Sequence, residues 1–95
     1  MDSVSVEKLH FIKGNCYIEL KDYANAVLEL QAAVRLQGAG NESYRSLAIA
    51  LANDGKLEEA QQELDTLQKK GASSGDCDLV AAEILFLQKN YDQAL

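Results

Sequence analysis

With 95 residues and a mass of 10.4 kDa, the chain can form one small domain and is too short for a scaffold such as a (β/α)₈ barrel, which needs about 200 residues or more. Hydrophobic residues make up 47% and charged residues 25%, which is typical of a folded globular chain. The net charge of -6 argues against binding to nucleic acid or to an anionic membrane surface, because both depend on clustered Lys and Arg.

Targeting segments and cysteines narrow the class further. The N-terminal residues include Asp2 and Glu7 and no apolar core, so they do not resemble a signal peptide. The longest nearly apolar run, residues 79–87, is about half as long as a membrane span. Cys16 and Cys77 form no CxxC pair, so we expect unlinked, buried or half-buried thiols in a reducing compartment, the cytoplasm.

One short sequence motif occurs three times with a period of 34 residues, at residues 21–26, 55–60 and 89–94. The motif ends on Ala26, Ala60 and Ala94. Residues aligned at this period keep their size: Leu30 aligns with Leu64, Gly14 with Ala48 and Ala82, and Tyr17 with Leu51 and Leu85. A repeat of this length indicates a stack of similar structural units.

The first unit predicts two helices. Apolar residues recur at helical spacing in its first half, at Leu9, Ile12, Cys16 and Leu20. Lys21-Asp22 then supplies a polar break. The second helix contains Ala26 to Val34 and ends at Gly38-Ala39-Gly40, because glycines after the last periodic residue signal a helix C-terminus.

The second unit predicts helices over about residues 42–53 and 58–70, with Asn41 as N-cap and a turn at Asp54-Gly55. Residues 71–75 form the loosest linker in the chain. In the third unit a helix is predicted over about residues 77–88, and a further one begins near Asp92. No segment alternates with period two, so we expect no strands.

These units resemble the tetratricopeptide repeat (TPR). The matching positions are Gly14, Tyr17, Ala26, Leu30 and Ala33 in the first unit, Tyr44, Leu47, Ala48, Leu51, Ala60 and Leu64 in the second, and Ala81, Ala82, Leu85 and Ala94 in the third. His10, Lys13 and Gly38 depart from the family pattern. The resemblance implies an all-α fold of antiparallel helix pairs, stacked as a right-handed α-solenoid with repeats at about residues 7–40, 41–74 and 75–95.

No set of residues predicts catalysis, a cofactor or a metal site. His10 is the only histidine, and we interpret it as a packing or surface residue rather than a ligand or a base. The acidic group at residues 58, 59, 63 and 65 is interpreted as a solvated helix face, with a weak calcium site as the alternative. Gly38-Ala39-Gly40 follows a predicted helix, so it is interpreted as a helix end and not as a dinucleotide motif.

The resemblance places the first helix of each unit along a concave groove. The groove residues it implies are Phe11, Asn15, Ile18, Glu19, Arg45, Ile49, Asn53, Leu79, Glu83 and Phe86, together with Lys8, Glu42, Ala52, Asp76 and Leu87. Apolar residues that the repeat core does not need, rimmed by acids, favour a peptide or a basic amphipathic helix as ligand. The alternative is that these side chains are scattered, or covered by flanking chain.

Some members of this family clamp the C-terminal carboxylate of a partner with Lys and Asn side chains. Only Asn15 matches that set, because Phe11, Ser46, Asp76 and Val80 occupy the other positions. Without the cations the charge-assisted hydrogen bonds are lost, so we expect no such clamp.

The expected function is a non-catalytic module that binds a partner protein or peptide. The alternative is a substrate-recruiting appendage of an enzyme whose active site lies outside these residues. The third unit adds one expectation, because residues 79–87 are apolar on all sides and the helix that would cover them is cut short. We therefore expect the chain to be a piece of a longer repeat protein and to self-associate through its C-terminal helix.

Overall fold

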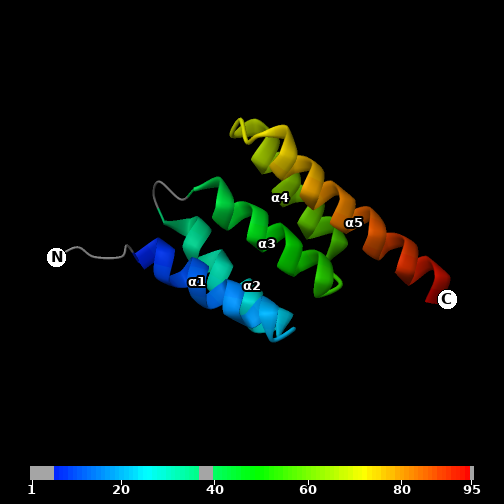
Figure 1. The fold of residues 1–95 in the computed structure, drawn as a ribbon, viewed down its shortest axis with the longest axis horizontal. Coiled ribbons are helices and arrows are strands. Elements are labelled where there is room, and N and C mark those ends of the chain that lie inside the picture. The colour runs from blue at the N-terminus through cyan, green and yellow to red at the C-terminus, as the bar shows by residue number, and fades with distance from the viewer. Residues whose placement is uncertain (1–5, 37–39, 95) are drawn as a thin grey trace.

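The computed structural model describes residues 6–36 and 40–94, which form five α-helices and, within those ranges, no strand. The helices are α1 (Val6–Glu19), α2 (Tyr23–Arg35), α3 (Asn41–Asn53), α4 (Leu57–Lys69) and α5 (Ser74–Ala94). In Figure 1, α1, α3 and α5 run in the same direction, and α2 and α4, which connect them in sequence, run in the opposite direction. The prediction of an all-α fold with helices in sequential pairs is confirmed.

The helices pack in two layers. Each helix contacts the next one in sequence, and α3 also contacts both α1 and α5. Among the described residues, no Cα atom of α2 lies within 8 Å of a Cα atom of α4. The first helices of the three units, α1, α3 and α5, thus form one layer in which α3 contacts both neighbours, called the joined layer below, while α2 and α4 belong to the other layer.

The turns inside the first two pairs are built alike. In the first, the Asp22 amide donates to the Tyr17 carbonyl oxygen at 2.8 Å, and in the second the Lys56 amide donates to the Leu51 carbonyl oxygen at 2.8 Å. Lys21 has φ 62° and the aligned Gly55 has φ 86°. The sequence period is thus reproduced as the same backbone turn, in which a left-handed residue ends the first helix.

The third unit lacks this turn, and the predicted helix start near Asp92 is wrong. Lys89 aligns with Lys21 and Gly55, yet α5 continues through it to Ala94. A left-handed lysine costs about 1 kcal/mol, which the packing of α2 against α1 offsets at Lys21. No described helix packs back on α5 beyond Lys89, so the right-handed conformation is retained there.

Helix α5 also begins earlier than predicted. Its first residue is Ser74, and Gly75 lies inside the helix rather than in a linker. The Ser73 hydroxyl oxygen accepts a hydrogen bond from the Asp76 amide at 3.2 Å, which is the geometry of an N-cap. Gly71, with φ 78°, ends α4, so the real connection between α4 and α5 is shorter than the predicted linker.

The core occupies the interior between the helix pairs, and aligned residues fill it in the first two units. Ala26 and Ala60 are fully buried, as are Leu30 and, nearly so, Leu64. Gly14 lies against Leu30, so closely that a β-carbon at position 14 would lie 2.5 Å from the Leu30 Cγ. A small residue on the first helix therefore receives a large residue from the second, which lets the two backbones approach closely.

The regular apolar residues that predict the first helix are not the residues that it buries. Its regular apolar residues, Leu9, Ile12, Cys16 and Leu20, are exposed, Leu20 at 74%. Helix α2 packs instead on the side of α1 that contains Gly14, and Leu9 and Ile12 on the other side are each 48% exposed. Cys16 is therefore not buried as expected, and Cys77 is half-buried, whereas the expectation that the two are not linked is confirmed.

Helix α3 starts without the predicted side-chain cap. Gly40 is the N-cap residue and Asn41 is the first helical residue, while Gly38 and Ala39 lie outside the described residues. The Glu7 carboxylate of α1 accepts hydrogen bonds from the Gly40 amide at 2.9 Å and from the Ser43 hydroxyl at 2.8 Å. An acid from the first unit thus stabilises the N-terminus of the second.

Glu63 on α4 predicts a pH dependence of stability. Partial burial, and secondarily the neighbouring Glu59, raise the pKa of the Glu63 carboxyl. The folded state therefore binds the proton more tightly than the unfolded state, and its stability falls as the pH rises through the raised pKa. We expect Glu63→Gln to raise the denaturation midpoint at pH 7, and this gain to vanish at about pH 3, where the Glu63 carboxyl is protonated in both the folded and the unfolded state.

The control for this measurement is Glu58→Gln, at an exposed position on the same helix. Urea denaturation of both variants and of the unchanged chain at the two pH values measures the effect. A loss of stability for Glu63→Gln at pH 7, or a gain that is the same at both pH values, would contradict it.

Candidate functional site

The residues predicted to line a groove all lie in the joined layer of helices. Helix α1 contributes Phe11, Asn15, Ile18 and Glu19, α3 contributes Arg45, Ile49 and Asn53, and α5 contributes Leu79, Glu83 and Phe86. Because α3 contacts both other helices, these residues lie on three neighbouring elements. They belong to one layer of the molecule and not to separate regions of it.

The apolar members fall into two groups. Phe11, Ile18 and Ile49 are half-buried and pack against the hydrophobic core. The interpretation that the core does not need them is therefore wrong for these three, which share their surface between the core and solvent. Leu79 and Phe86 on α5 are exposed, Phe86 at 62%.

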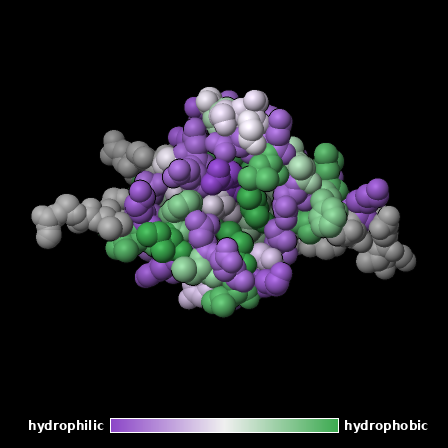
Figure 2. All heavy atoms as spheres, viewed as in Figure 1, coloured by the Kyte–Doolittle hydropathy of each residue, from purple (hydrophilic) through white to green (hydrophobic). Residues whose placement is uncertain are grey.

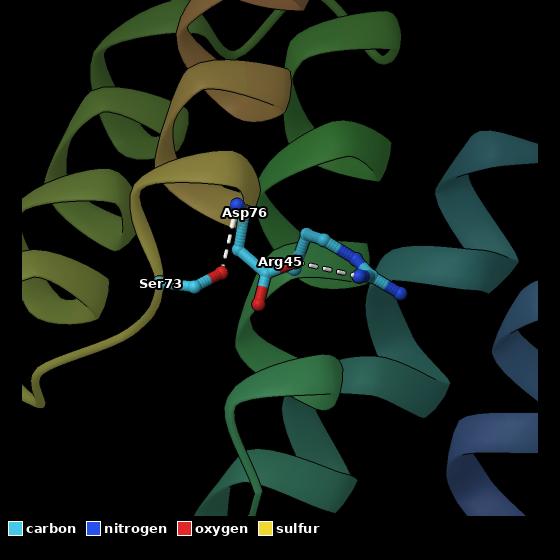
Figure 3. A network of polar contacts seen from close by, with 3 residues as sticks. All are labelled: Arg45, Ser73 and Asp76. Carbon is cyan, nitrogen blue, oxygen red and sulfur yellow. Dashed lines mark hydrogen bonds and ion pairs between the residues drawn. The ribbon is translucent and has the colours of Figure 1, made fainter.

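Arg45 and Asp76 join α3 to α5 at the start of α5. The Arg45 guanidinium lies 2.8 Å from the Asp76 carboxylate, and both side chains are about 30% exposed. Figure 3 shows this ion pair beside the cap formed by Ser73. One acid thus holds the only predicted groove cation on α3, so Arg45 does not offer an unpaired positive charge to a ligand.

A second polar link lies further along the same two helices. The Asn53 side-chain amide donates to the Glu83 carboxylate at 3.0 Å and to the Ile49 carbonyl oxygen at 2.9 Å. Two polar links therefore fix α5 against α3 on the layer that carries the candidate residues. Ile49 lies between Arg45 and Asn53 along α3 and packs against the core.

The predicted groove residues carry a surplus of negative charge. Their acids are Glu19, Glu42, Asp76 and Glu83, and their bases are Lys8 and Arg45. Glu19 and Glu42 are exposed to solvent. Such a surface attracts cationic ligands and repels anionic ones.

Residues of the same three helices that are not groove candidates have structural roles. The His10 ring lies 2.8 Å from the Glu29 carboxylate and so connects α1 with α2, in keeping with a packing role. Ser46 and Val80, which occupy two positions of the family's carboxylate clamp, are buried. A depression at the turn between α3 and α4 is lined by residues 55–59, none of which is a groove candidate.

The acidic residues of α4 are not clustered in the way that metal ligands are. In the described residues, no three His, Cys, Asp or Glu side chains are grouped as metal ligands.

No helix of the described ranges combines the length and apolar character needed to cross a membrane. No protein-family model, curated protein or solved structure matches the chain.

Proposed function

We propose that this chain is a non-catalytic interaction module that binds a segment of a partner protein across α1, α3 and α5. The repeat supports the proposal, because the sequence period recurs in the structure as the same turn at Lys21 and at Gly55. In this proposal the helix pairs form a right-handed stack of TPR type, and the joined layer is its concave side. Such stacks present extended binding surfaces.

The proposed ligand is a basic amphipathic helix. The observation that carries this choice is the row of half-buried apolar side chains on α1 and α3, at Phe11, Ile18 and Ile49, beside exposed acids. Figure 2 shows that apolar atoms on the viewed face lie in separate patches interleaved with hydrophilic ones. A matching ligand needs apolar anchors spaced along one face and cations between them, with apolar contacts holding the complex and opposite charge speeding its formation.

The test uses two synthetic helical peptides with the same leucine positions, one with lysines and one with glutamates on the polar face. We expect the lysine peptide to bind more tightly, and its affinity to fall as salt is added. Phe11→Ala should weaken it about tenfold, which corresponds to the loss of a buried aromatic contact. Glu83→Gln should weaken it less, because an amide oxygen still accepts the Asn53 hydrogen bond.

The matched control is Leu28→Ala on α2, where the leucine is 63% exposed and lies away from the layer. Isothermal titration calorimetry measures all four proteins under the same conditions. Equal affinity for the two peptides, or an unchanged affinity after Phe11→Ala, would contradict the proposed ligand.

A further inference from the structure

One stripe on α5 lacks the cover that its counterparts have in α1 and α3. The stripe consists of Asp78, Ala82, Leu85 and Lys89. The first three align with His10, Gly14 and Tyr17 in α1 and with Tyr44, Ala48 and Leu51 in α3, and Lys89 aligns with the turn residues Lys21 and Gly55. In α1, these positions face α2, since Gly14 meets Leu30 and His10 meets Glu29. In α3, Ala48 and Leu51 are buried.

In α5 the same positions are open. All four residues of the stripe are exposed, with Leu85 at 64%. The opposite side of α5 contains the buried Val80 and Ile84, which pack into the core. Asp78, Ala82 and Leu85 therefore occupy helix-packing positions with no helix on them among the described residues, and Lys89 continues the same side of α5.

The stripe on one copy of α5 is complementary to the same stripe on a second, antiparallel copy. Its residues are spaced four, three and four apart, which is the spacing of one helix face and is the same in both directions. In an antiparallel pair of such helices, Asp78 lies opposite Lys89 of the second copy, and Ala82 lies opposite Leu85. The two-fold axis of the pair then gives every contact twice.

In this antiparallel pair, both the apolar and the charged contacts are complementary. Ala82 opposite Leu85 places a small residue against a large one, as Gly14 does against Leu30 in the α1–α2 pair. Asp78 opposite Lys89 joins opposite charges, and neither has an ion pair among the described residues. Exposed Leu79 and Phe86 border the stripe and enlarge its apolar surface.

We infer that α5 pairs antiparallel with α5 of a second copy of this chain, so that each copy supplies the packing helix that the other lacks. Helix α5 is long enough to act as a packing helix for a second copy, because it has 21 residues and spans about 30 Å at 1.5 Å per residue. The inference goes beyond the proposed peptide-binding role, because none of the four stripe residues is a groove candidate, and only Leu79 and Phe86 border both surfaces.

Sedimentation equilibrium of the whole chain over a wide concentration range tests whether the dimer forms. Charge-reversal variants test the register in which the two α5 helices pair. The unchanged chain should pass from monomer to dimer as concentration rises. Asp78→Lys and Lys89→Asp should each weaken dimerisation about tenfold or more, because like charges then face each other. The double variant Asp78→Lys, Lys89→Asp should recover the original dimerisation, since the opposite charges are restored in exchanged places.

Leu85→Glu should abolish the dimer, whereas Leu9→Glu, at an exposed apolar position on α1, should leave it intact. Circular dichroism verifies that each variant keeps its helices, which we expect because all four positions are exposed. A chain that stays monomeric at every concentration overturns the inference. It is equally overturned by a dimer that Leu9→Glu dissociates, or by one that both single charge variants leave unchanged.

Discussion

Replacing Gly14 with valine is expected to lower the free energy of unfolding by about 3 kcal/mol, at the upper end of the usual cost of overpacking a core. A β-carbon at this position would lie 2.5 Å from Cγ and 2.7 Å from Cδ2 of Leu30. Leu30 is fully buried, so it has no open space into which to move. The two γ-methyl groups of valine add to the clash, and the helices α1 and α2 must separate to accommodate them.

Urea denaturation measures this loss, and Gly75→Ala is its matched control. Gly75 lies in α5 with only the Ser73 hydroxyl, at 3.9 Å, near the place of an added β-carbon. That substitution should leave stability unchanged or raise it by up to about 1 kcal/mol, because alanine favours helix over glycine. Adding Leu30→Ala to Gly14→Val should restore part of the loss, since the two residues are in contact. Equal stability of Gly14→Val and the unchanged chain would exclude the close approach of α1 and α2.

Truncating Leu67 to alanine is expected to cost about 2–5 kcal/mol, the range observed when a buried leucine leaves a cavity. Leu67 lies on α4 and is fully buried in the core. A small domain is stable by only about 5–15 kcal/mol, so this loss should lower the melting temperature substantially. Circular dichroism at low protein concentration measures it without a contribution from dimerisation.

The matched control is Leu28→Ala, because the same atoms are removed from a side chain that is mostly exposed. Its effect should be within about 0.5 kcal/mol. Similar losses for the two variants would show that Leu67 is not in a packed core, and would contradict the assignment of α4 as the second helix of its pair.

Local sequence signals predicted the helices and two of the turns well. Gly55 and the polar break at Lys21 both mark real helix ends. Lys89 carries nearly the same local signal as Lys21 but remains helical, because the left-handed conformation forms only where a second helix packs back. Local pattern therefore identifies where a turn can form, while tertiary packing decides whether it does.

The helical period does not determine which side of a helix is buried when both sides carry apolar residues. In α1, Leu9 and Ile12 form the more regular stripe, yet the side with Gly14 is covered. Close packing against Leu30 needs the small residue, and this outweighs the regularity of the other stripe. The bond from Glu7 to the start of α3 joins residues that are far apart in sequence, and no local signal marks it.

The candidate residues could be placed on the first helices from the repeat alignment, but their pairing could not. Arg45 and Asn53 are both engaged by acids of α5, which depends on the offset between α3 and α5 in three dimensions. The half-burial of Phe11 likewise depends on how closely α1 approaches its neighbours. Sequence pattern thus locates the surface, whereas its charge pairing and exposure follow only from packing.

The binding surface is tested most directly by a methyl NMR spectrum of the isoleucines during titration with the lysine peptide. The chain contains only four isoleucines. Ile18 and Ile49 lie in the proposed surface, Ile12 is exposed on the uncovered side of α1, and Ile84 is buried. We predict saturable shifts of the Ile18 and Ile49 methyl signals, with Ile12 and Ile84 unchanged. Shifts of Ile12 with Ile18 and Ile49 unmoved would contradict binding across α1, α3 and α5.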